Sequence, residues 1–417
     1  MLNFAKKTEK LTLDEIVNYY RNACKTSGEK KIGLEYERIS LDLKSHKTIN
    51  PELMSNTIEE FATRFGWGIL YDGEVVLGAI KNNTSISLEP GGQFEISYKP
   101  ENSIKNIECG ISKIISDFDK IAKTNGIKFL EKGITPYSTH AEIKILKKNR
   151  YLIMAEYLKE QGTLAPAMMR ETAGIQINCD YSSEENAILQ LKFLNKIMPF
   201  MTALCANSNT RAGIDTGYKS YRALIWKYTD NARSGTFYND ILDNATTFAC
   251  YIEKILDVPM LFIERGDRKI LINGKITFRE FMENGYEGEN ATFADYLLHS
   301  SLTFGDIRLK NSIEIRNHDT NSLDIALGLC AFYKGLLQNE KEIKKLYAMF
   351  SEIAFSDVEK YGFEASKHGL DFELTGKIKN KFKNPQEIIE FLINSAEKNL
   401  EDSEKHYLDS LRELCKA

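Results

Sequence analysis

Four short segments of this chain alternate between apolar residues and acidic or amide residues, and this pattern limits the folds open to it. The segments read GLEYE at 33–37, EPGGQFEIS at 89–97, IQIN at 175–178 and IEIR at 313–316. In a β-strand the side chains of residues i and i+2 lie on the same face, so each segment places two polar groups together. The predicted pairs are Glu35 with Glu37, Gln93 with Glu95, Gln176 with Asn178, and Glu314 with Arg316.

Acidic side chains gathered on one concave surface need a cationic partner, because like charges at short range raise each other's pKa values and destabilise the folded chain. Arg222, Arg233 and Arg316 supply part of the charge, and Mg²⁺ ions that bridge carboxylates to ATP phosphates suit the excess of acids better. For any single pair a solvated strand face, with Glu beside surface Lys, explains the pattern equally well. Four pairs in one chain favour a shared site. The acids are Glu35, Glu37, Glu89, Glu95 and Glu314.

Helical periodicity fills the stretches between these strands. Apolar residues recur at helical spacing over 13–23, 58–65, 104–122, 151–160 and 187–206. Between residues 85 and 97 two strand-like runs flank the turn sequence PGG, which predicts an antiparallel hairpin. We therefore predict an α+β fold whose largely antiparallel sheet has one polar concave face and helices packed behind the other.

Composition excludes several classes of protein. A net charge of -4 and a pI near 6.0 argue against a nucleic-acid-binding surface. The first residues, MLNFAKK, lack the apolar core of a secretory signal, and Asn195, Lys196 and Pro199 interrupt the longest apolar stretch, 193–206. We expect a soluble cytoplasmic protein without a membrane partner.

Common site motifs are missing as well. The seven cysteines are scattered without a CxxC pair, so zinc and a disulfide framework are not expected. The sequence GIDTGYKS at 213–220 lacks the glycine directly before lysine that a P-loop needs. GxGxxG, GxSxG and HExxH are also absent, which removes the usual nucleotide, hydrolase and zinc-protease signatures.

The order of motifs along the chain resembles the glutamate-cysteine ligase family of the plant and bacterial type, family 2. The matching motifs run from about residue 31 to 335, and LEPGGQFEIS is the most specific of them. They read GxExE at 33–37, LEPGGQFEIS at 88–97, MMRxTAxxQxN at 168–178, GYxSxRxxxW at 217–226, TDxxRSG at 229–235 and RLKxxxEIR at 308–316.

This resemblance implies a fold, a reaction and a set of site residues. The fold is a curved antiparallel sheet that forms a funnel covered by helices, as in glutamine synthetase and the guanidino kinases. The reaction uses ATP and Mg²⁺ to phosphorylate the γ-carboxylate of L-glutamate, and the amine of L-cysteine then displaces phosphate to give γ-glutamylcysteine for glutathione or related thiols. The implied metal ligands are Glu35, Glu37, Glu89, Glu95, Gln176 and Glu314. The implied catalytic residues are Arg222, Arg316 and Glu314.

The remaining implied residues contact the substrates. Asn178, Arg233 and Arg308 would lie near the ATP phosphates. Arg222, Arg316 and Trp226 would bind the substrate, since the planar fork of Arg suits both carboxylate and phosphate. Packing is an equal alternative for Trp226, and a solvated basic pair is an equal alternative for Arg308 with Lys310.

The lysine- and glutamate-rich end of the chain lacks the strand pattern. The sequence NPQE at 384–387 favours a helix start, because Asn caps, Pro fits the first turn and Glu follows three residues later. We predict a catalytic carboxylate-amine ligase domain over 1–337 and a helical lobe over 338–417 that packs on it. A monomer is favoured over a dimer.

Two loops depart from the family pattern and leave the acceptor open. After Arg316 the family commonly reads Gly-Ala-Asp, whereas this chain reads NHD at 317–319. Before Arg308 it reads FGD at 304–306, where the family often has Phe-Pro. A related ligase that joins glutamate to another amine, and a non-catalytic nucleotide-binding homologue, are therefore the alternatives to glutamate-cysteine ligation.

Overall fold

The predicted antiparallel sheet is present and has nine strands. A computed structural model describes residues 10–25, 30–235, 244–266 and 268–416. The sheet is open, with strand order β14-β15-β7-β1-β5-β4-β3-β2, and β6 pairs with β1 at one end. All pairs in it are antiparallel. The strands are β1 (Ile32–Asp42), β2 (Gly68–Asp72), β3 (Val75–Lys81), β4 (Thr84–Leu88), β5 (Phe94–Glu101), β6 (Ile127–Leu130), β7 (Gly174–Cys179), β14 (Ile307–Leu309) and β15 (Ile313–Asp319).

The four alternating segments lie in neighbouring strands of this sheet. They form β15, β7, β1 and β5, in that spatial order, although they are far apart in the sequence. The register places Glu37 opposite Glu95, and Glu35 opposite Gln176. It also places Glu314 opposite Asn178. Strand pairing therefore brings the predicted polar pairs together on a single face.

The helices that periodicity predicts are all present. The helix α2 begins at Pro51, earlier than the apolar spacing over 58–65 predicts. It starts there because Asn50 accepts a hydrogen bond from the Glu52 amide and Pro51 occupies the first turn. The predicted hairpin joins β4 to β5, with Ser85 opposite Ser97. The helices are α1 (Leu13–Asn22), α2 (Pro51–Phe65), α3 (Ile104–Thr124), α4 (Asn149–Leu158), α6 (Glu184–Leu204) and α15 (Pro385–Glu397).

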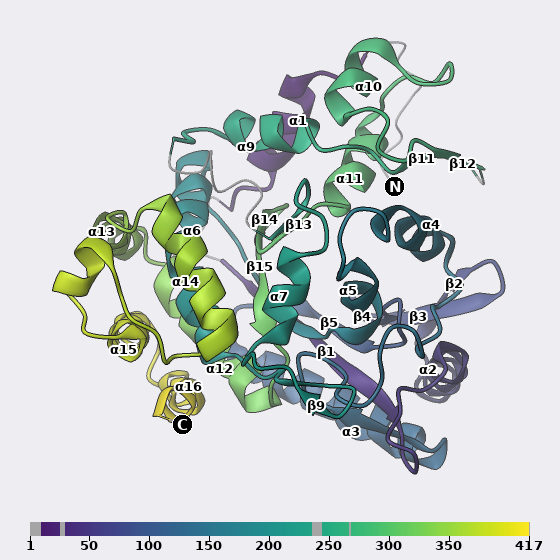
Figure 1. The fold of residues 1–417 in the computed structure, drawn as a ribbon, viewed down its shortest axis with the longest axis horizontal. Helices are drawn as coiled ribbons and strands as arrows, with labels where there is room; N and C mark the ends of the chain where they lie inside the picture. The colour runs from purple at the N-terminus through teal and green to yellow at the C-terminus, as the bar shows by residue number, and fades with distance from the viewer. Residues whose placement is uncertain (1–9, 26–29, 236–243, 267, 417) are drawn as a thin grey trace.

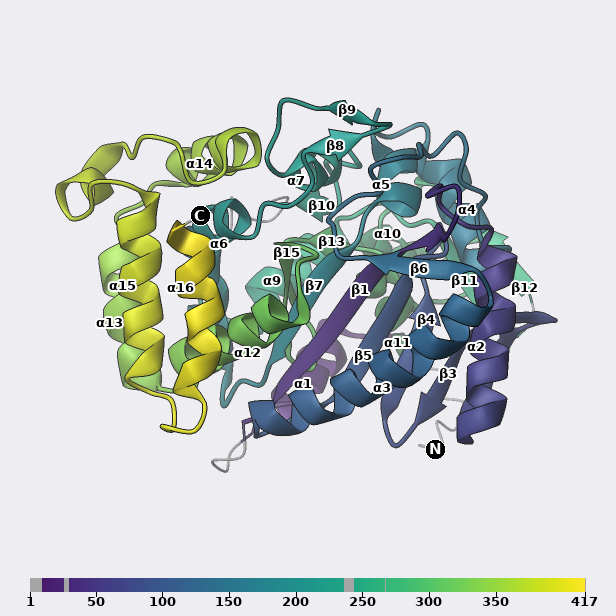
Figure 2. The same ribbon diagram turned by 90° about the horizontal axis from the view of Figure 1, so that it is seen from below.

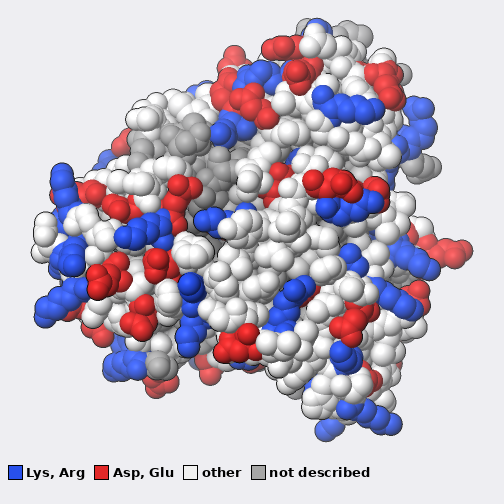
Figure 3. All heavy atoms as spheres, in the orientation of Figure 1, with Lys and Arg blue, Asp and Glu red and all other residues white. Residues whose placement is uncertain are grey.

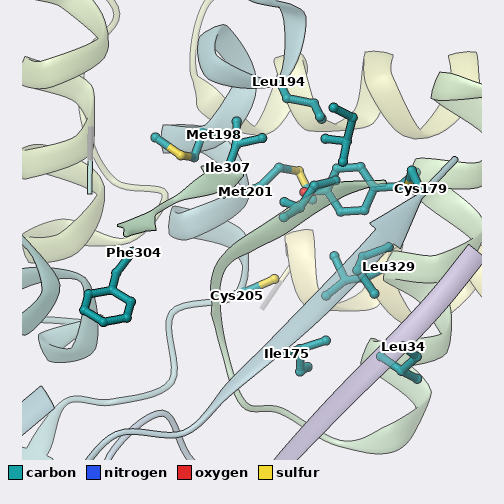
Figure 4. Close-up of a cluster of buried hydrophobic side chains, with 14 of the residues drawn as sticks. Leu34, Ile175, Cys179, Leu194, Met198, Met201, Cys205, Phe304, Ile307 and Leu329 are labelled. Carbon is teal, nitrogen blue, oxygen red and sulfur yellow. The ribbon is translucent and has the colours of Figure 1, made fainter. Parts of the chain in front are cut away.

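The apolar face of the sheet packs against α2, α3 and α12 (Leu323–Leu337). Figure 2 shows α3 crossing this face, with α12 beside it. Leu34 on β1 and Ile175 on β7 are fully buried here and meet Leu329 of α12 in one cluster (Figure 4). Period-two alternation thus separates the core from the polar face within each strand.

Three other helices lie over the polar face. They are α4, α5 (Ala165–Glu171) and α7 (Tyr221–Lys227), and Figure 1 shows them on the side of β1 and β5 away from α3. The small elements around them are β8 (Thr210–Arg211), β9 (Ile214–Asp215), β10 (Ser234–Gly235), β11 (Phe262–Arg265), β12 (Arg268–Leu271), β13 (Phe304–Gly305), α9 (Phe248–Leu256), α10 (Phe278–Asn284) and α11 (Phe293–Ser301).

The C-terminal segment is helical, as its composition predicts. Its helices pack on α6 and α12, and Figure 2 shows α13, α15 and α16 side by side. Asn384 caps α15 by accepting from the Glu387 amide, which confirms the expected helix start. The domain division at residue 337 stays a prediction. The further helices are α13 (Glu340–Phe350), α14 (Phe355–His368), α16 (Asp409–Lys416) and the short 3-10 helices η1 (Gly376–Asn380) and η2 (Lys405–Leu408).

Among the described residues, no helix combines the length and apolar character needed to cross a membrane. Residues 1–7, on which the expectation of no secretory signal rests, lie outside the described residues.

The hairpin turn yields a stability prediction at Gly91. A Cβ at this position would lie 2.8 Å from the backbone Cα of Arg170, which cannot rotate away. We expect Gly91→Ala to lower the free energy of unfolding by about 3 kcal/mol in urea titrations. The control is Gly73→Ala, where φ is +62° and no atom lies within 4 Å, so that only the strain of about 1 kcal/mol remains. Equal losses in the two variants would contradict the close approach.

Candidate active site

Four carboxylates of the polar face line one cavity of about 280 Å³. Glu35 and Glu37 come from β1, Glu95 comes from β5, and Glu89 stands at the end of β4 in the hairpin turn. Gln176 on β7 joins them. Of the six predicted metal ligands, the structure thus brings five to this cavity.

The opposite wall comes from the helices that cover the polar face. Met168 and Met169 on α5 form part of it, as pocket-wall methionines that fill an irregular surface. Trp226 on α7 also borders the cavity. Five cationic side chains from several elements also line the cavity: Lys148, Arg150, Arg222, Arg308 and Arg316.

The carboxylates resist ionisation in this cavity. Burial, together with the charges of neighbouring acids, raises the pKa of Glu35 to about 7 and that of Glu89 to about 8. Burial also raises the pKa values of Glu37 and Glu95. A cation that binds here would therefore relieve both desolvation and repulsion.

Hydrogen bonds hold three of these carboxylates in defined orientations. Glu37 accepts from the Gly174 amide at 2.6 Å and from Gln176 Nε2 at 3.0 Å. Glu35 accepts from Asn178 Nδ2 at 2.8 Å. Glu95 accepts from two hydroxyls, those of Ser97 at 2.6 Å and Ser87 at 3.1 Å. The carboxylates are therefore positioned by their own sheet.

Glu314 differs from the other acids of this face. Its carboxylate accepts from Arg308 Nε at 2.7 Å, from Lys310 Nζ at 2.8 Å and from Arg316 Nη1 at 3.2 Å. Burial opposes its ionisation, but these three cations outweigh burial and hold its pKa well below the ordinary value. Arg308 and Lys310 are therefore partners of a buried acid, and the alternative of a solvated basic pair is wrong.

Arg222 is held by a network at the start of α7. The Asp319 carboxylate accepts from Ser208 Oγ at 2.6 Å and from Ser220 Oγ at 2.9 Å. Ser208 Oγ in turn accepts from the Arg222 amide, and Ser220 Oγ caps α7 at Ala223. Arg222 Nη2 then donates to the carbonyl of Arg316 at 3.0 Å, which links α7 to β15.

The acids of the cavity do not belong to an exposed acidic patch. Figure 3 shows that the surface around α7 is largely uncharged, with isolated cationic side chains. The negative charge therefore lies inside the molecule, where Coulomb interactions are stronger than at the surface.

Comparison with known proteins identifies the family. The model of glutamate-cysteine ligase family 2 matches residues 31–416. This chain belongs to glutamate-cysteine ligase family 2. A chloroplastic glutamate-cysteine ligase of Medicago truncatula is 32% identical over 366 residues, which cover 87% of this chain and 72% of the relative. Chloroplastic glutamate-cysteine ligase A of Oryza sativa subsp. indica is 33% identical over 348 residues, 83% of this chain and 70% of the relative.

A solved structure shares the fold of this family member. It is the glutamate-cysteine ligase from Francisella tularensis in complex with AMP, and the alignment covers 93% of this chain and 81% of that chain. The TM-score is 0.55 at 12% sequence identity, so the likeness concerns the fold. The sheet architecture implied by the resemblance is confirmed.

Three predicted site residues are placed differently from expectation. Arg233 is fully buried and does not line the cavity; its guanidinium donates to Asp230, Tyr157 and the carbonyls of Leu302 and Pro259. In this structure these core partners occupy its guanidinium, and the predicted contact with the ATP phosphates stays a prediction. The motif TDxxRSG gave the residue but could not show which way it points.

Glu314 and Asn178 also lie off the cavity lining. In this structure the Glu314 carboxylate accepts from three cations, and its role as a metal ligand stays a prediction. Asn178 donates to Glu35 and accepts from Ser312, and it borders a separate cavity of about 720 Å³ at the end of the same strand face.

Sequence reasoning missed Lys148 and Arg150. Both come from the start of α4 and line the cavity with the carboxylates. The run KKNR at 147–150 was the available signal, but a basic run is usually a solvated surface, so it carried no information about the site. Only the tertiary fold, in which the Tyr151 hydroxyl of α4 donates to the Leu88 carbonyl at the end of β4, brings these cations to the acids.

The donor set fits Mg²⁺. Within the described parts of the chain, no three His, Cys, Asp or Glu side chains are grouped closely enough to hold a metal ion by themselves. Mg²⁺ does not need such a cage, because it keeps several waters and binds through one or two carboxylates plus substrate phosphates. The carboxylates of Glu35, Glu37, Glu89 and Glu95 supply oxygen ligands of this kind.

The raised pKa values predict how Mg²⁺ changes stability with pH. Because the folded-state pKa values of Glu35 and Glu89 exceed their ordinary value of 4.5, protons favour the folded state; this contribution is fully present below about pH 4.5 and is lost progressively as the pH rises to about 7 for Glu35 and about 8 for Glu89. Without Mg²⁺ the melting temperature should therefore fall over this window. Mg²⁺ should raise it more at about pH 8.5 than at about pH 6, since it binds the ionised forms.

Thermal melts with and without MgCl₂, at ionic strength matched by NaCl, measure this effect. In Glu89→Gln the difference between the two pH values should shrink. An Mg²⁺ effect of equal size at both pH values would contradict a cation site among these carboxylates.

Proposed function

We propose that this family member joins the γ-carboxylate of L-glutamate to the amine of L-cysteine with hydrolysis of ATP to ADP and phosphate, giving γ-glutamylcysteine. The observation that carries the proposal is the single cavity in which Glu35, Glu37, Glu89 and Glu95 face Arg222, Arg308 and Arg316, in a chain of glutamate-cysteine ligase family 2. A cytoplasmic location, a monomeric state and a role in glutathione or related thiol synthesis belong to the same proposal.

The carboxylates would hold Mg²⁺, with Gln176 beside them. A carboxylate is a poor electrophile at neutral pH, and bound MgATP would supply the phosphoryl group that turns it into an acyl phosphate. The oxygen atoms of Glu35, Glu37, Glu89 and Glu95 fit this task because hard cations prefer such ligands. Glu314 would act on the arginines instead, by holding Arg308 and Arg316 at the cavity edge.

The arginines would bind and stabilise the negatively charged reacting groups. Arg316 and Arg222 would bind the glutamate carboxylate and stabilise the charge spread over the transferring phosphoryl group. Arg308 from β14, together with Lys148 and Arg150 from the start of α4, would meet the ATP phosphates. No covalent nucleophile is needed, which agrees with the absence of a nucleophile motif in the sequence.

A reconstituted assay tests the proposal. Purified protein is incubated with ATP, Mg²⁺ and L-glutamate, the amine is varied, and phosphate release is followed together with product mass. Turnover with L-cysteine well above that with other amines is expected. If another amine is preferred, that amine and not L-cysteine is the acceptor. If no ATP is consumed with any amine, ligase activity is contradicted.

Substitution of a cavity carboxylate tests the metal-binding role. We expect Glu35→Gln to lower kcat about 100-fold or more, since it removes charge where phosphoryl transfer needs Mg²⁺. Its melting temperature should stay close to wild type, because the amide relieves repulsion. The control is Glu142→Gln, an exposed carboxylate paired with Lys47, which should leave kcat unchanged. Near-normal turnover by Glu35→Gln would remove this residue from the metal site.

Glu314→Gln should behave differently from Glu35→Gln. It leaves buried Arg308 and Arg316 without their counter-charge, so we expect a loss of about 3 kcal/mol in the free energy of unfolding, together with lost activity. Denaturant titration separates the two cases. Full stability of Glu314→Gln would show that the three cations do not depend on this acid.

A further inference from the structure

A second cavity of about 440 Å³ adjoins the first and shares Arg222 and Trp226 with it. It lies on the side of α7 that faces α6 and α14, whereas the carboxylate cavity lies toward the sheet. The helix α14, from the C-terminal segment, supplies Phe355 and Phe363 to its wall. Two cavities that meet at one arginine can hold two molecules that react with each other.

Buried polar atoms without partners gather around this second cavity. Arg222, Trp226, Ser234 and Asn317 all line it, and one buried polar atom of each (Nε, Nε1, Oγ and Oδ1, respectively) lacks a hydrogen-bond partner among the described residues. The side chains of Arg222, Ser234 and Asn317 are more than nine-tenths buried. Because an unsatisfied buried polar group is costly, several at one cavity indicate a polar ligand.

The charges of this cavity suit a zwitterion. Arg222 and Lys227 contribute two positive charges, and Asp306 and Glu359 contribute two negative charges. The Asp306 carboxylate makes no hydrogen bond to a described side chain, and burial raises its pKa to about 6 although Arg222 and Arg316 counteract this. The unpaired Asp306 carboxylate suits an ammonium group, and the unpartnered donors of Arg222, Trp226 and Ser234 suit a carboxylate group. A molecule that carries both groups would therefore match this cavity.

The non-polar part of the wall limits what the rest of the ligand can be. Met198 and Pro199 on α6 face Phe355, Val358 and Phe363 across the cavity. These side chains favour a short, weakly polar group such as a thiol or a small alkyl chain.

We infer that this second cavity is the acceptor subsite, in which Asp306 and Asn317 bind the ammonium group of an α-amino acid and α14 contacts its side chain. The inference rests on the proposed function, since it names where the acceptor of that ligation binds. Both residues belong to the segments that depart from the family pattern, NHD at 317–319, which ends β15, and FGD at 304–306, which includes β13. The acceptor preference of this chain is therefore set by its own residues in these segments.

Kinetics of two variants test the subsite. Asp306→Asn should raise the KM for L-cysteine about 10-fold to 100-fold, the loss expected when a charge-assisted hydrogen bond is removed. Phe363→Ala should change the preference between L-cysteine and longer amino acids. The KM values for ATP and L-glutamate should stay within about 2-fold of wild type in both variants. Lys360→Ala, an exposed position on the same helix, is the control.

Hydroxylamine separates acceptor binding from glutamate activation. This small nucleophile traps an acyl phosphate without filling the subsite, so the rate of γ-glutamyl hydroxamate formation should be unchanged in Asp306→Asn. A merely structural defect would lower this rate as well. An unchanged KM for L-cysteine in both variants, or a raised KM for L-glutamate instead, would overturn the assignment.

Calorimetric titration with L-cysteine and L-α-aminobutyrate measures binding at the subsite in the absence of turnover. We expect wild type to bind both and Asp306→Asn to lose binding. If wild type consumes no ATP with glutamate and any amine, the proposed function fails, yet loss of binding in Asp306→Asn would still support the subsite. Failure of wild type to bind either amino acid would overturn it.

Discussion

The crowding of carboxylates on one buried sheet face is the electrostatic constraint on which the rest of this structure depends. The same face meets this constraint in two ways. Glu314 on β15 is neutralised by Arg308, Lys310 and Arg316, which holds its pKa low. Glu35 on β1 and Glu89 at the end of β4 make no ion pair with a described residue, and burial raises their pKa values. The charge of Glu314 is thus compensated by cations of the protein, whereas the ionised forms of Glu35 and Glu89 need a bound cation.

Arg222 connects this electrostatic centre to the rest of the molecule. It reaches the carboxylate cavity and the second cavity, and its backbone is fixed by Ser208 and Ser220 under Asp319. Residues of α14 line the second cavity, so the C-terminal helices form part of its wall as well as covering α6. The domain division at residue 337 stays a prediction, and α14, which lies beyond it, supplies part of this wall.

Local patterns predicted much of the fold because they report local geometry. Period-two alternation identified β1, β5, β7 and β15, and apolar spacing at period 3.6 identified α3 and α6. Motif matching named Glu35, Glu37, Glu89 and Glu95, which the structure brings to one cavity, but it could not separate Arg233, whose guanidinium bonds to core residues, from Arg316 at the cavity. It also gave no reason to select Asp306 or Lys148, because each contributes only through the elements packed against it.

The sequence by itself determined which residues share a strand face and which family the chain resembles, since both depend on order and spacing along the chain. Tertiary structure alone decided that β15, β7, β1 and β5 are neighbours, and that Glu37 therefore stands opposite Glu95. It also decided which acids have cations beside them and which do not. The physical reason is that charge interactions and desolvation depend on distance and burial in space, and the linear sequence contains neither.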